Sequence, residues 1–329
     1  MTILLFGGTG NLSADCAALI HTQGHGVQIM TRGHNQLPPE YTAFRADRKD
    51  LEALRRVVDK AKPDVVVDFI AYDLEDVRIA YECLRGRVRQ YVFISSATVY
   101  RKPPQQLPIT EDTPLGNPYW DYAQRKIACE HWLRARWEQD CFPVTIVRPS
   151  HTYSRRWVPN PVSSSSFTFA RRIELGLPVF VPDDGESLWT LTASTDFAAG
   201  LAGLLGRADT LGQAFHITSD EALSWNQIVR EIADALGVSE PRCLRVPTDL
   251  ICRVVPQLTG NLKGDKAHPA VFDNTRIKRF VPGFRCRVPF RVGVRESVAW
   301  LRSHPEHQNL NPAVDAMCKA VAAASAGRR

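Results

Sequence analysis

The sequence predicts an α/β protein: a doubly wound parallel sheet followed by a smaller C-terminal lobe. Three observations support this fold class. Short β-branched runs, such as residues 65–71, alternate with amphipathic stretches, such as residues 50–61, over the first 150 residues. A glycine-rich turn follows the first apolar run. Beyond residue 150 the alternation stops, and proline- and serine-rich stretches separate the remaining segments.

Each element of the first part has its own pattern. Apolar residues 3–6 form the first strand, and apolar positions at helical spacing after the turn predict a helix that ends near Gly24. Further strands are expected at residues 26–30, 42–45, 65–71, 91–95 and 143–148. Helices are expected at residues 50–61, 76–84 and 121–137.

The later part of the chain divides between the two lobes. We expect residues 1–155 to form the first domain, with segment 187–217 and its strand at 214–217 returning to that sheet. Residues 156–186 and 218–303 form the smaller lobe. Residues 304–329 are polar and then alanine-rich, which predicts a loosely attached helix or a frayed tail.

Composition excludes several classes of protein. Hydrophobic residues make up 44% and charged residues 23%, which is globular rather than disordered. The apolar runs are too short to span a membrane, and the N-terminus lacks the basic region of a signal peptide, so we expect a cytoplasmic protein. The net charge of +6 is spread out, which makes nucleic acid an unlikely partner. Eight scattered cysteines and the pair His304 and His307 predict no metal site.

The turn at residues 7–10 lies between the first strand and the first helix. Backbone N–H groups and the helix dipole can hold a pyrophosphate at such a turn. In the pattern G-x-x-G-x-x-G, which starts at Gly7, Ser13 stands in place of the third glycine, and its small side chain still allows close helix packing. The glycines would also suit an ordinary turn, but the context favours dinucleotide binding. The expected contacts are Gly7, Thr9, Gly10, Asn11 and Leu12.

Residues after the later strands bear on which dinucleotide binds. A carboxylate after the second strand would bind the ribose of NAD, whereas an arginine can accept the 2′-phosphate of NADP. Arg32 stands there and leaves NADP open, although it equally suits a solvated turn. Asp47 is expected near the adenine amine or, alternatively, as a helix N-cap. Ile70 and Ala71, at the end of another strand, are further expected cofactor contacts.

Tyr122 and Lys126 lie four residues apart in an expected helix, which places a phenol and an ammonium on one face. A tyrosine ionises near pH 10, so work as a base near neutrality needs about three pKa units of stabilisation. A neighbouring cation has the right sign. A tyrosine and a lysine at this spacing also occur by chance on exposed helices. The catalytic interpretation is supported by Ser96, at the carboxyl end of the strand 91–95, whose hydroxyl can reach Tyr122.

These motifs resemble the extended short-chain dehydrogenase/reductase superfamily. The similarity is greatest to its NAD-dependent epimerase/dehydratase branch, of which UDP-galactose 4-epimerase is typical. It rests on Gly7-Gly8-Thr9-Gly10, on Ser95-Ser96-Ala97-Thr98-Val99-Tyr100 and on Tyr122-x-x-x-Lys126. It is supported by Glu111, Pro114, Glu130, Arg148-Pro149 and Thr195-Asp196-Phe197-Ala198. The resemblance implies a Rossmann dinucleotide-binding domain, a substrate-binding C-terminal lobe and bound NAD or NADP, tightly bound NAD being typical of epimerases.

The resemblance also implies roles for individual residues. Ser96 would hydrogen-bond the reacting hydroxyl, Tyr122 would be the acid/base, and Lys126 would bind the nicotinamide ribose and lower the pKa of Tyr122. His151 and Ser154 depart from the family's usual Asn and Gly, which predicts an unusual pocket. The expected substrate contacts are Tyr72, Thr98, His151, Tyr153 and Arg276.

The leading functional hypothesis is epimerisation of a sugar, expected to be nucleotide-linked, through a transient ketone. Dehydratases of the branch carry an acidic pair directly after the catalytic hydroxyl residue, where this chain has Ala97 and Thr98, so dehydration ranks lower. An NADPH-dependent ketone or aldehyde reductase is the alternative, motivated by Arg32. An RNA-binding or redox-sensing member of the fold is the non-enzymatic alternative. Relatives also imply a homodimer formed through the helices at residues 76–84 and 121–137.

Overall fold

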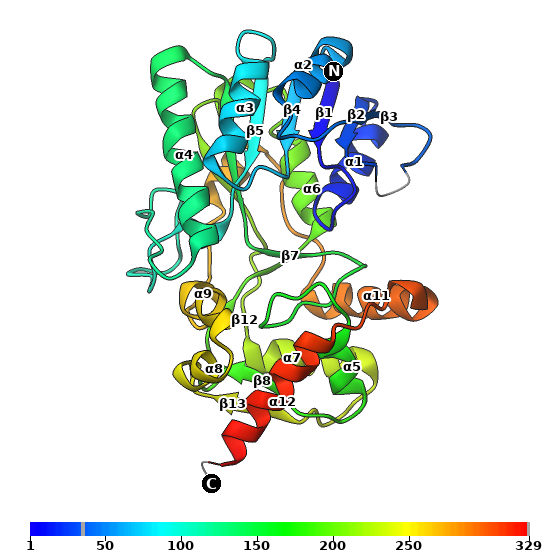
Figure 1. The fold of residues 1–329 in the computed structure, drawn as a ribbon, viewed down its shortest axis with the longest axis vertical. Helices are drawn as coiled ribbons and strands as arrows, with labels where there is room; N and C mark the ends of the chain where they lie inside the picture. The colour runs from blue at the N-terminus through cyan, green and yellow to red at the C-terminus, as the bar shows by residue number, and fades with distance from the viewer. Residues whose placement is uncertain (34–36, 328–329) are drawn as a thin grey trace.

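A computed structural model describes residues 1–33 and 37–327 of the chain. Its centre is a seven-stranded sheet of order β11-β6-β5-β4-β1-β2-β3, in which every neighbouring pair is parallel (Figure 1). The strands are β1 (Thr2–Phe6), β2 (Gly26–Thr31), β3 (Thr42–Arg45), β4 (Val65–Asp68), β5 (Gln90–Ile94), β6 (Val144–Pro149) and β11 (Ala214–Ile217). The strand order reverses between β1 and β4, where doubly wound sheets open a crevice. The predicted fold class is confirmed.

Helices cover both faces of this sheet. Because side chains alternate along a strand, Ile3 and Leu5 pack toward α1 and α6, whereas Leu4 and Phe6 pack toward the other face. The first face carries α1 (Ser13–Thr22) and α6 (Ser194–Ala202). The second carries α2 (Leu51–Ala61), α3 (Leu74–Leu84) and α4 (Asp121–Asp140). The strands β1, β4, β5, β6 and β11 are therefore buried on both sides, as their unbroken apolar runs predict, whereas the edge strand β3 is largely exposed.

Three elements begin or end at other residues than the sequence predicts, at positions where side chains cap a helix or bind the backbone. The fourth strand ends at Asp68 rather than at residue 71, because the buried Asp68 carboxylate accepts hydrogen bonds from Arg48 and from the backbone of Ile70. Helix α3 starts two residues earlier than expected because Asp73 forms a capping box. Helix α4 runs three residues further, to a left-handed Cys141.

The second lobe lies below the carboxyl ends of the sheet (Figure 1). Its core joins the parallel pair β8 (Val179–Pro182) and β13 (Cys243–Val246) to surrounding helices. These helices are α5 (Thr168–Glu174), α7 (Trp225–Leu236), α8 (Thr248–Val254), α11 (Phe290–Ser303) and α12 (Pro312–Ala326). Short pairs connect the lobes: β7 (His151–Tyr153) with β10 (Leu191–Ala193), and β9 (Leu188–Trp189) with β12 (Leu223–Ser224). The short α9 (Thr259–Asn261) and a π-helix at Leu262–Lys266 complete it, whereas α10 (Thr275–Phe280) packs against β11 of the central sheet through Ile277.

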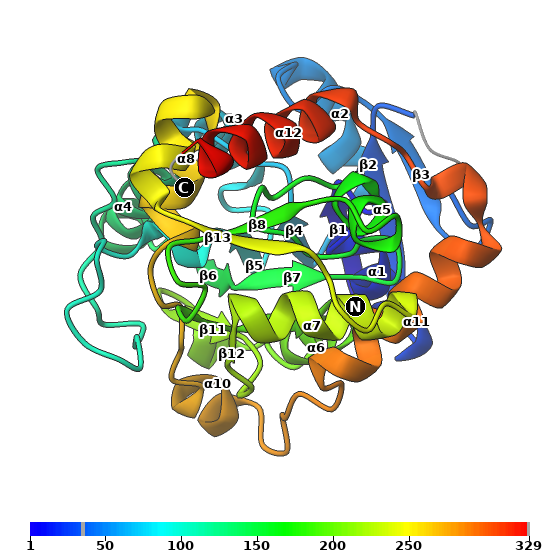
Figure 2. The same cartoon turned by 90° about the horizontal axis from the view of Figure 1, so that it is seen from below.

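Helix α12 is firmly packed, so the expectation of a loose C-terminal segment is wrong for its described residues. Val314, Cys318 and Val321 recur at helical spacing and are buried in the core of the second lobe. Asp315 forms an ion pair with the buried Arg172. Seen from below, α12 lies across the lobe beside α8 (Figure 2). The precise division of the chain between the lobes stays an interpretation.

Candidate active site

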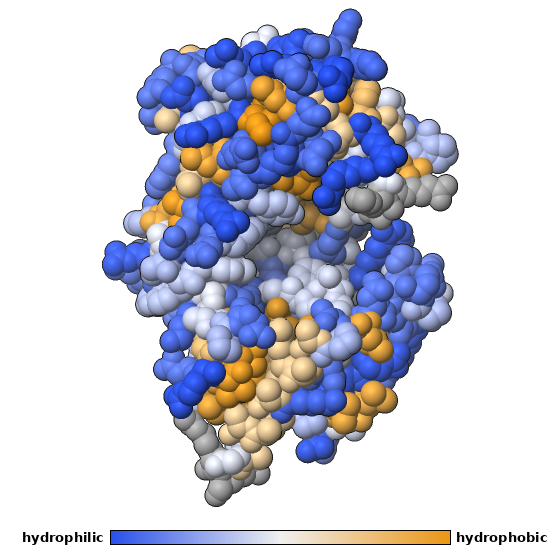
Figure 3. All heavy atoms as spheres, in the orientation of Figure 1, coloured by the Kyte–Doolittle hydropathy of each residue, from blue (hydrophilic) through white to orange (hydrophobic). Residues whose placement is uncertain are grey.

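A cleft of about 1010 Å³ opens at the carboxyl ends of the central strands. The molecule is visibly hollowed between the sheet and the second lobe on the face shown in Figure 3. The cleft brings together most of the predicted site residues. Those that line it are Gly7, Thr9, Gly10, Asn11, Leu12, Arg32, Asp47, Ile70, Tyr72, Ser96, Tyr122, Lys126 and His151.

The glycine turn suits an anionic ligand. Gly7 has a φ of +78°, and a Cβ on it would lie 2.5 Å from Ile70, so only glycine makes this turn without strain. Helix α1 begins at the cleft without a side-chain cap, and Asn11 and Leu12 beside its first turn line the cavity. Uncapped N–H groups at a helix start attract a phosphate. The residues present therefore fit the pyrophosphate of a dinucleotide.

Neighbouring contacts fix the shape of this turn. The Gly10 N–H donates to Ser13 Oγ at 2.9 Å, so Ser13 closes the turn where a third glycine is more common. The Asn11 amide donates to the Thr152 carbonyl at 3.0 Å, and its oxygen accepts from Ser154. Asn11 thus joins the glycine turn to the segment that leads into the second lobe.

The far end of the cleft is basic. Arg32 follows β2 and lines the cleft, whereas Arg45 lies beside Gly33 in a neighbouring pocket, because a Cβ on Gly33 would sit 3.2 Å from Arg45 Nε. Parallel pairing of Thr31 with Arg45 causes this proximity, which sequence reasoning missed. Asp47 lines the cleft, and its carboxylate accepts the Lys49 N–H at 2.9 Å, whereas Asp50 caps α2; the N-cap alternative for Asp47 is therefore wrong.

Ser96 and Tyr122 meet at the inner end of the cleft. Ser96 follows β5, and its hydroxyl oxygen accepts from the Thr98 N–H at 3.2 Å and the Thr98 hydroxyl at 2.9 Å. Tyr122, in the first turn of α4, has its pKa raised to about 12 because burial disfavours the phenolate, and its interaction with Ser96 opposes that rise. At neutral pH the phenol therefore carries its proton.

The Lys126 ammonium is held by backbone carbonyls, and its expected effect on the pKa of Tyr122 stays a prediction. The ammonium donates to the carbonyls of Ala71, at 2.6 Å, and Ile94, at 2.7 Å, and lies 5.9 Å from the centre of the Tyr122 ring. Burial lowers the pKa of Lys126 itself to about 8. Ala71, expected to contact the cofactor, is fully buried and instead supplies a carbonyl to this ammonium.

A second cavity of about 140 Å³ continues inward from Ser96 and Tyr122. Thr98 and His151 line it, as expected for substrate contacts. Tyr153 and Arg276 line neither cavity, so their assignment as substrate contacts is wrong. The Tyr153 ring packs in the core, 5.4 Å from the Phe290 ring. Arg276 pairs with Asp112 at 2.7 Å, and its Nε lies 3.7 Å from Glu111.

A buried ion pair holds the ends of β5 and β6 against α4. Glu130 on α4 accepts from Arg148 Nε at 2.9 Å and Nη2 at 2.6 Å, and from the Ser95 hydroxyl at 2.6 Å. Arg148, at the end of β6, also donates to the Tyr100 hydroxyl at 2.7 Å. The pair thereby fixes Ser96, next to Ser95, relative to Tyr122, which lies two helical turns before Glu130.

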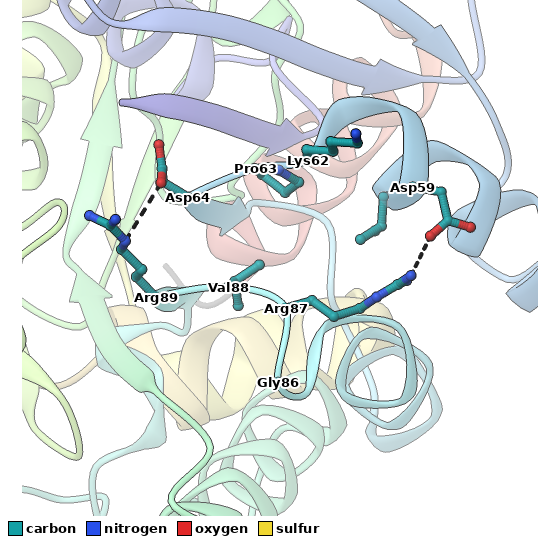
Figure 4. A pocket seen from close by; sticks show the side chains of 9 residues that line it. Asp59, Lys62, Pro63, Asp64, Gly86, Arg87, Val88 and Arg89 are labelled. Carbon is teal, nitrogen blue, oxygen red and sulfur yellow. Dashed lines mark hydrogen bonds and ion pairs between the residues drawn. The ribbon is translucent and has the colours of Figure 1, made fainter.

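Another pocket lies at the opposite edge of the sheet, between the loops that precede β4 and β5 (Figure 4). Its rim carries ion pairs of Asp59 with Arg87 and of Asp64 with Arg89, the latter at 3.6 Å. These paired surface charges are structural, because ligands of open α/β sheets bind at the carboxyl edge.

Within residues 1–33 and 37–327, no group of three potential metal ligands is found, and no helix has the length and hydropathy to cross a membrane.

Comparisons with known proteins agree with this geometry. Residues 3–217 match the model of the NAD dependent epimerase/dehydratase family. The chain is 28% identical over 239 residues to the 2′-dehydrokanamycin reductase of Streptomyces kanamyceticus, covering 72% of this chain and 67% of that protein. It is 27% identical over 260 residues to the chloroplast stem-loop binding protein of 41 kDa b of Arabidopsis thaliana, covering 73% of this chain and 64% of that protein.

A solved structure shows the same fold. The UDP-glucose 4-epimerase of Thermus thermophilus, in complex with NAD, has a TM-score of 0.75 at 22% identity, over 92% of this chain and 99% of that one. The family match covers well over half of this chain, and the glycine turn, Ser96, Tyr122 and Lys126 surround one cleft. The chain therefore belongs to the NAD-dependent epimerase/dehydratase family and is an NAD(P)-dependent enzyme.

Proposed function

We propose that this protein interconverts a secondary hydroxyl and a ketone on a sugar, at the junction of the two cavities. One observation carries the proposal: Ser96 and Tyr122 line both the large cleft and the small inner cavity. A group held in the inner cavity therefore meets the cofactor cleft at these two hydroxyls. Ser96 hydrogen-bonds the reacting oxygen, and Tyr122 exchanges a proton with it.

The residues that would hold the cofactor are those of the large cleft. The glycine turn and the start of α1 suit the pyrophosphate, Arg32 lines the expected adenosine end, and Arg45 lies in a neighbouring pocket that shares Thr31 with the cleft. NAD(P), when bound, supplies reversible hydride exchange. Asp47, Ile70 and Lys126 line the same cleft and are proposed as further contacts.

Epimerisation is the first candidate reaction, because it needs a single acid/base and a ketone that can turn over in the pocket. Dehydration would need further acid/base groups. Ala97 and Thr98 follow Ser96, and Asp265, the acidic residue of the inner cavity, is engaged with Lys266 at 2.6 Å. For this epimerisation we propose the nucleotide-linked sugar that is expected from the sequence.

Reduction of a sugar ketone by NADPH is the second candidate, favoured by two observations. The raised pKa keeps Tyr122 protonated, which suits donation of a proton to a ketone oxygen. Arg32 in the cleft, and Arg45 beside the neighbouring Gly33, are cations that would suit the 2′-phosphate of NADP. The 2′-dehydrokanamycin reductase of Streptomyces kanamyceticus is a relative whose name states a reduction.

Cofactor consumption separates the candidates. Purified protein is incubated with NAD+ or with NADPH and with panels of nucleotide sugars and keto sugars, followed by absorbance and by mass spectrometry. An epimerase converts sugar with no net change in cofactor, whereas a reductase oxidises one NADPH per ketone. Absence of both reactions across the panels would contradict the proposed function.

The pH dependence should differ between the two directions of reaction. Because the pKa of Tyr122 is about 12, its phenol stays protonated near neutrality, and ketone reduction should be nearly flat with pH between about 6 and 9. Oxidation of the alcohol requires the phenolate, so its kcat/KM should rise about tenfold per pH unit. Initial rates in both directions measure this. A Lys126→Met variant separates any step due to Lys126, whose pKa is about 8.

Cofactor selectivity should depend on the two arginines. Removing Arg32 or Arg45 should raise KM for NADPH about 10- to 100-fold, since each would lose a hydrogen bond between charged groups, and should leave KM for NADH nearly unchanged. Steady-state kinetics of Arg32→Ala and Arg45→Ala test this, with the exposed Arg56→Ala on α2 as the control. Equal changes for both cofactors would contradict a 2′-phosphate site.

The assembly and the location stay proposals. Helices α3 and α4 lie side by side on one face of the sheet, which suits the homodimer that relatives imply, and sedimentation at several concentrations tests it (Figure 1). A cytoplasmic location is likewise a prediction from the sequence. RNA binding is not favoured, because Ser96, Tyr122 and Lys126 form a complete catalytic set in the cleft.

A further inference from the structure

We propose that the inner cavity binds a single uncharged pyranose ring, whose hydroxyl groups are recognised by Trp189, His151 and Asp265. This inference rests on the proposed function and names its substrate class: a glycoside that brings no phosphoryl group into this cavity. The cavity extends inward from Ser96 and Tyr122, so a ring seated in it places one carbon at these two hydroxyls.

Size and walls suit one sugar ring. The cavity holds about 140 Å³ and opens into the large cleft at Ser96 and Tyr122, so it is of the scale of one ring whose substituents reach into the cleft. Its walls include the aromatic side chains of Trp120, Trp157, Trp189 and Phe272. Aromatic rings bury the apolar C–H faces of a pyranose, and the hydroxyl groups then need a few well-placed polar partners.

Two buried polar atoms provide such partners. Trp189 Nε1 and His151 Nε2 have no hydrogen-bond partner within the described part of the chain, and both side chains line the cavity. Buried polar groups are nearly always paired, so two orphaned nitrogens at one cavity point to a polar ligand. Burial and the nearby Lys266 keep the pKa of His151 well below its usual value, so its ring is neutral. A neutral imidazole offers one donor and one acceptor.

Asp265 and Lys266 add an acceptor and a donor at the same cavity. Both are buried, and the Lys266 ammonium donates to the Asp265 carboxylate at 2.6 Å and lies 4.2 Å over the Trp189 ring. The π-helix that carries them is anchored, since Trp225 Nε1 donates to the Lys266 carbonyl at 2.9 Å. An adjacent carboxylate and ammonium match the donor and acceptor character of neighbouring hydroxyl groups.

Charge favours a neutral ligand over a diphosphate. Among the described residues that line the inner cavity, Lys266 is the one cation, and it is already paired with Asp265. Lys102 lies 3.9 Å from Asp265 outside the cavity lining, and burial lowers its pKa, which favours its neutral form. Recognition of a diphosphate relies on clustered arginines and lysines, whereas this lining has the single Lys266, whose charge is offset by Asp265.

Binding measured without turnover tests the inference. Calorimetry with cofactor-loaded Tyr122→Phe protein uses the methyl α-pyranosides of glucose, galactose and mannose, methyl β-D-glucuronide, UDP-glucose and UDP. We expect at least one neutral pyranoside to bind and UDP not to compete with it. Asp265→Asn should weaken binding about tenfold or more and Trp189→Phe about 3- to 10-fold, because each removes a hydrogen bond. Trp132→Phe, on the far side of α4, is the matched control and should change nothing.

Failure of the neutral sugar subsite and failure of the proposed function give different results. Competition of UDP with the pyranosides would overturn the neutral subsite and leave hydride exchange on a sugar intact. Unchanged binding in both Asp265→Asn and Trp189→Phe, or no binding of any neutral pyranoside, would likewise overturn it. Pyranoside binding that depends on Asp265 and Trp189, with no hydride exchange on any sugar by the unaltered enzyme, would support the subsite and refute the proposed function.

Discussion

Replacing Tyr122 with phenylalanine should lower kcat by a factor of about 10² to 10⁴, the usual contribution of a positioned general acid or base. The phenol ends the first turn of α4 beside Ser96, where it lines both cavities. The phenylalanine ring would keep the packing of the Tyr122 ring against Trp120, whose ring centre lies 5.1 Å away, so cofactor affinity should be retained. Turnover and cofactor titration on the same preparation measure the two effects separately.

Tyr119→Phe is the matched control for this substitution. Tyr119 stands three residues earlier and is 45% exposed, so the same loss of a hydroxyl there should leave kcat unchanged. A Tyr122→Phe enzyme that keeps kcat within a few-fold would show that another group moves the proton. His151 would then be the next candidate, because it lines the same junction.

Local patterns were sufficient to predict the central sheet. Unbroken apolar runs predicted parallel strands covered on both faces, because each strand side chain packs against helices above or below. The second lobe was harder, since pairs such as β7 with β10 are three residues long and form only through contacts distant in the chain. Helix α12 was misjudged because its buried face consists of a few moderate side chains among alanines.

In the site, too, residues set by local sequence patterns could be predicted, whereas those brought in by contacts distant in the chain could not. Gly7, Ser96 and Tyr122 could be predicted because each follows a strand or begins a helix at a fixed spacing. Asp265 and Lys266 could not, because they reach the cavity from a π-helix more than a hundred residues away in sequence. The orientation of Lys126 also escaped prediction, since helical spacing says nothing of the carbonyls of Ala71 and Ile94 that bind its ammonium.

Glu130→Leu should lower the free energy of unfolding by about 3 to 5 kcal/mol, the cost of leaving a buried charge without its partner. Glu130 and Arg148 are 0% and 1% exposed, and no water can replace the lost carboxylate around the guanidinium. Ser95 would lose its acceptor as well, which loosens the strand end that carries Ser96. We therefore expect kcat to fall even where the variant is folded, as urea denaturation and turnover below the transition can show.

A second substitution distinguishes loss of an ion pair from loss of packing. Adding Arg148→Met to Glu130→Leu removes the orphaned cation, so the double variant should recover much of the lost stability, as replacement of buried ion pairs by apolar residues often does. Glu52→Gln, which breaks the exposed pair of Glu52 with Arg55 on α2, should leave the unfolding free energy within experimental error. If the two core substitutions were simply additive, the pair would not be coupled, and the placement of Ser96 against Tyr122 would have to depend on strand and helix packing alone.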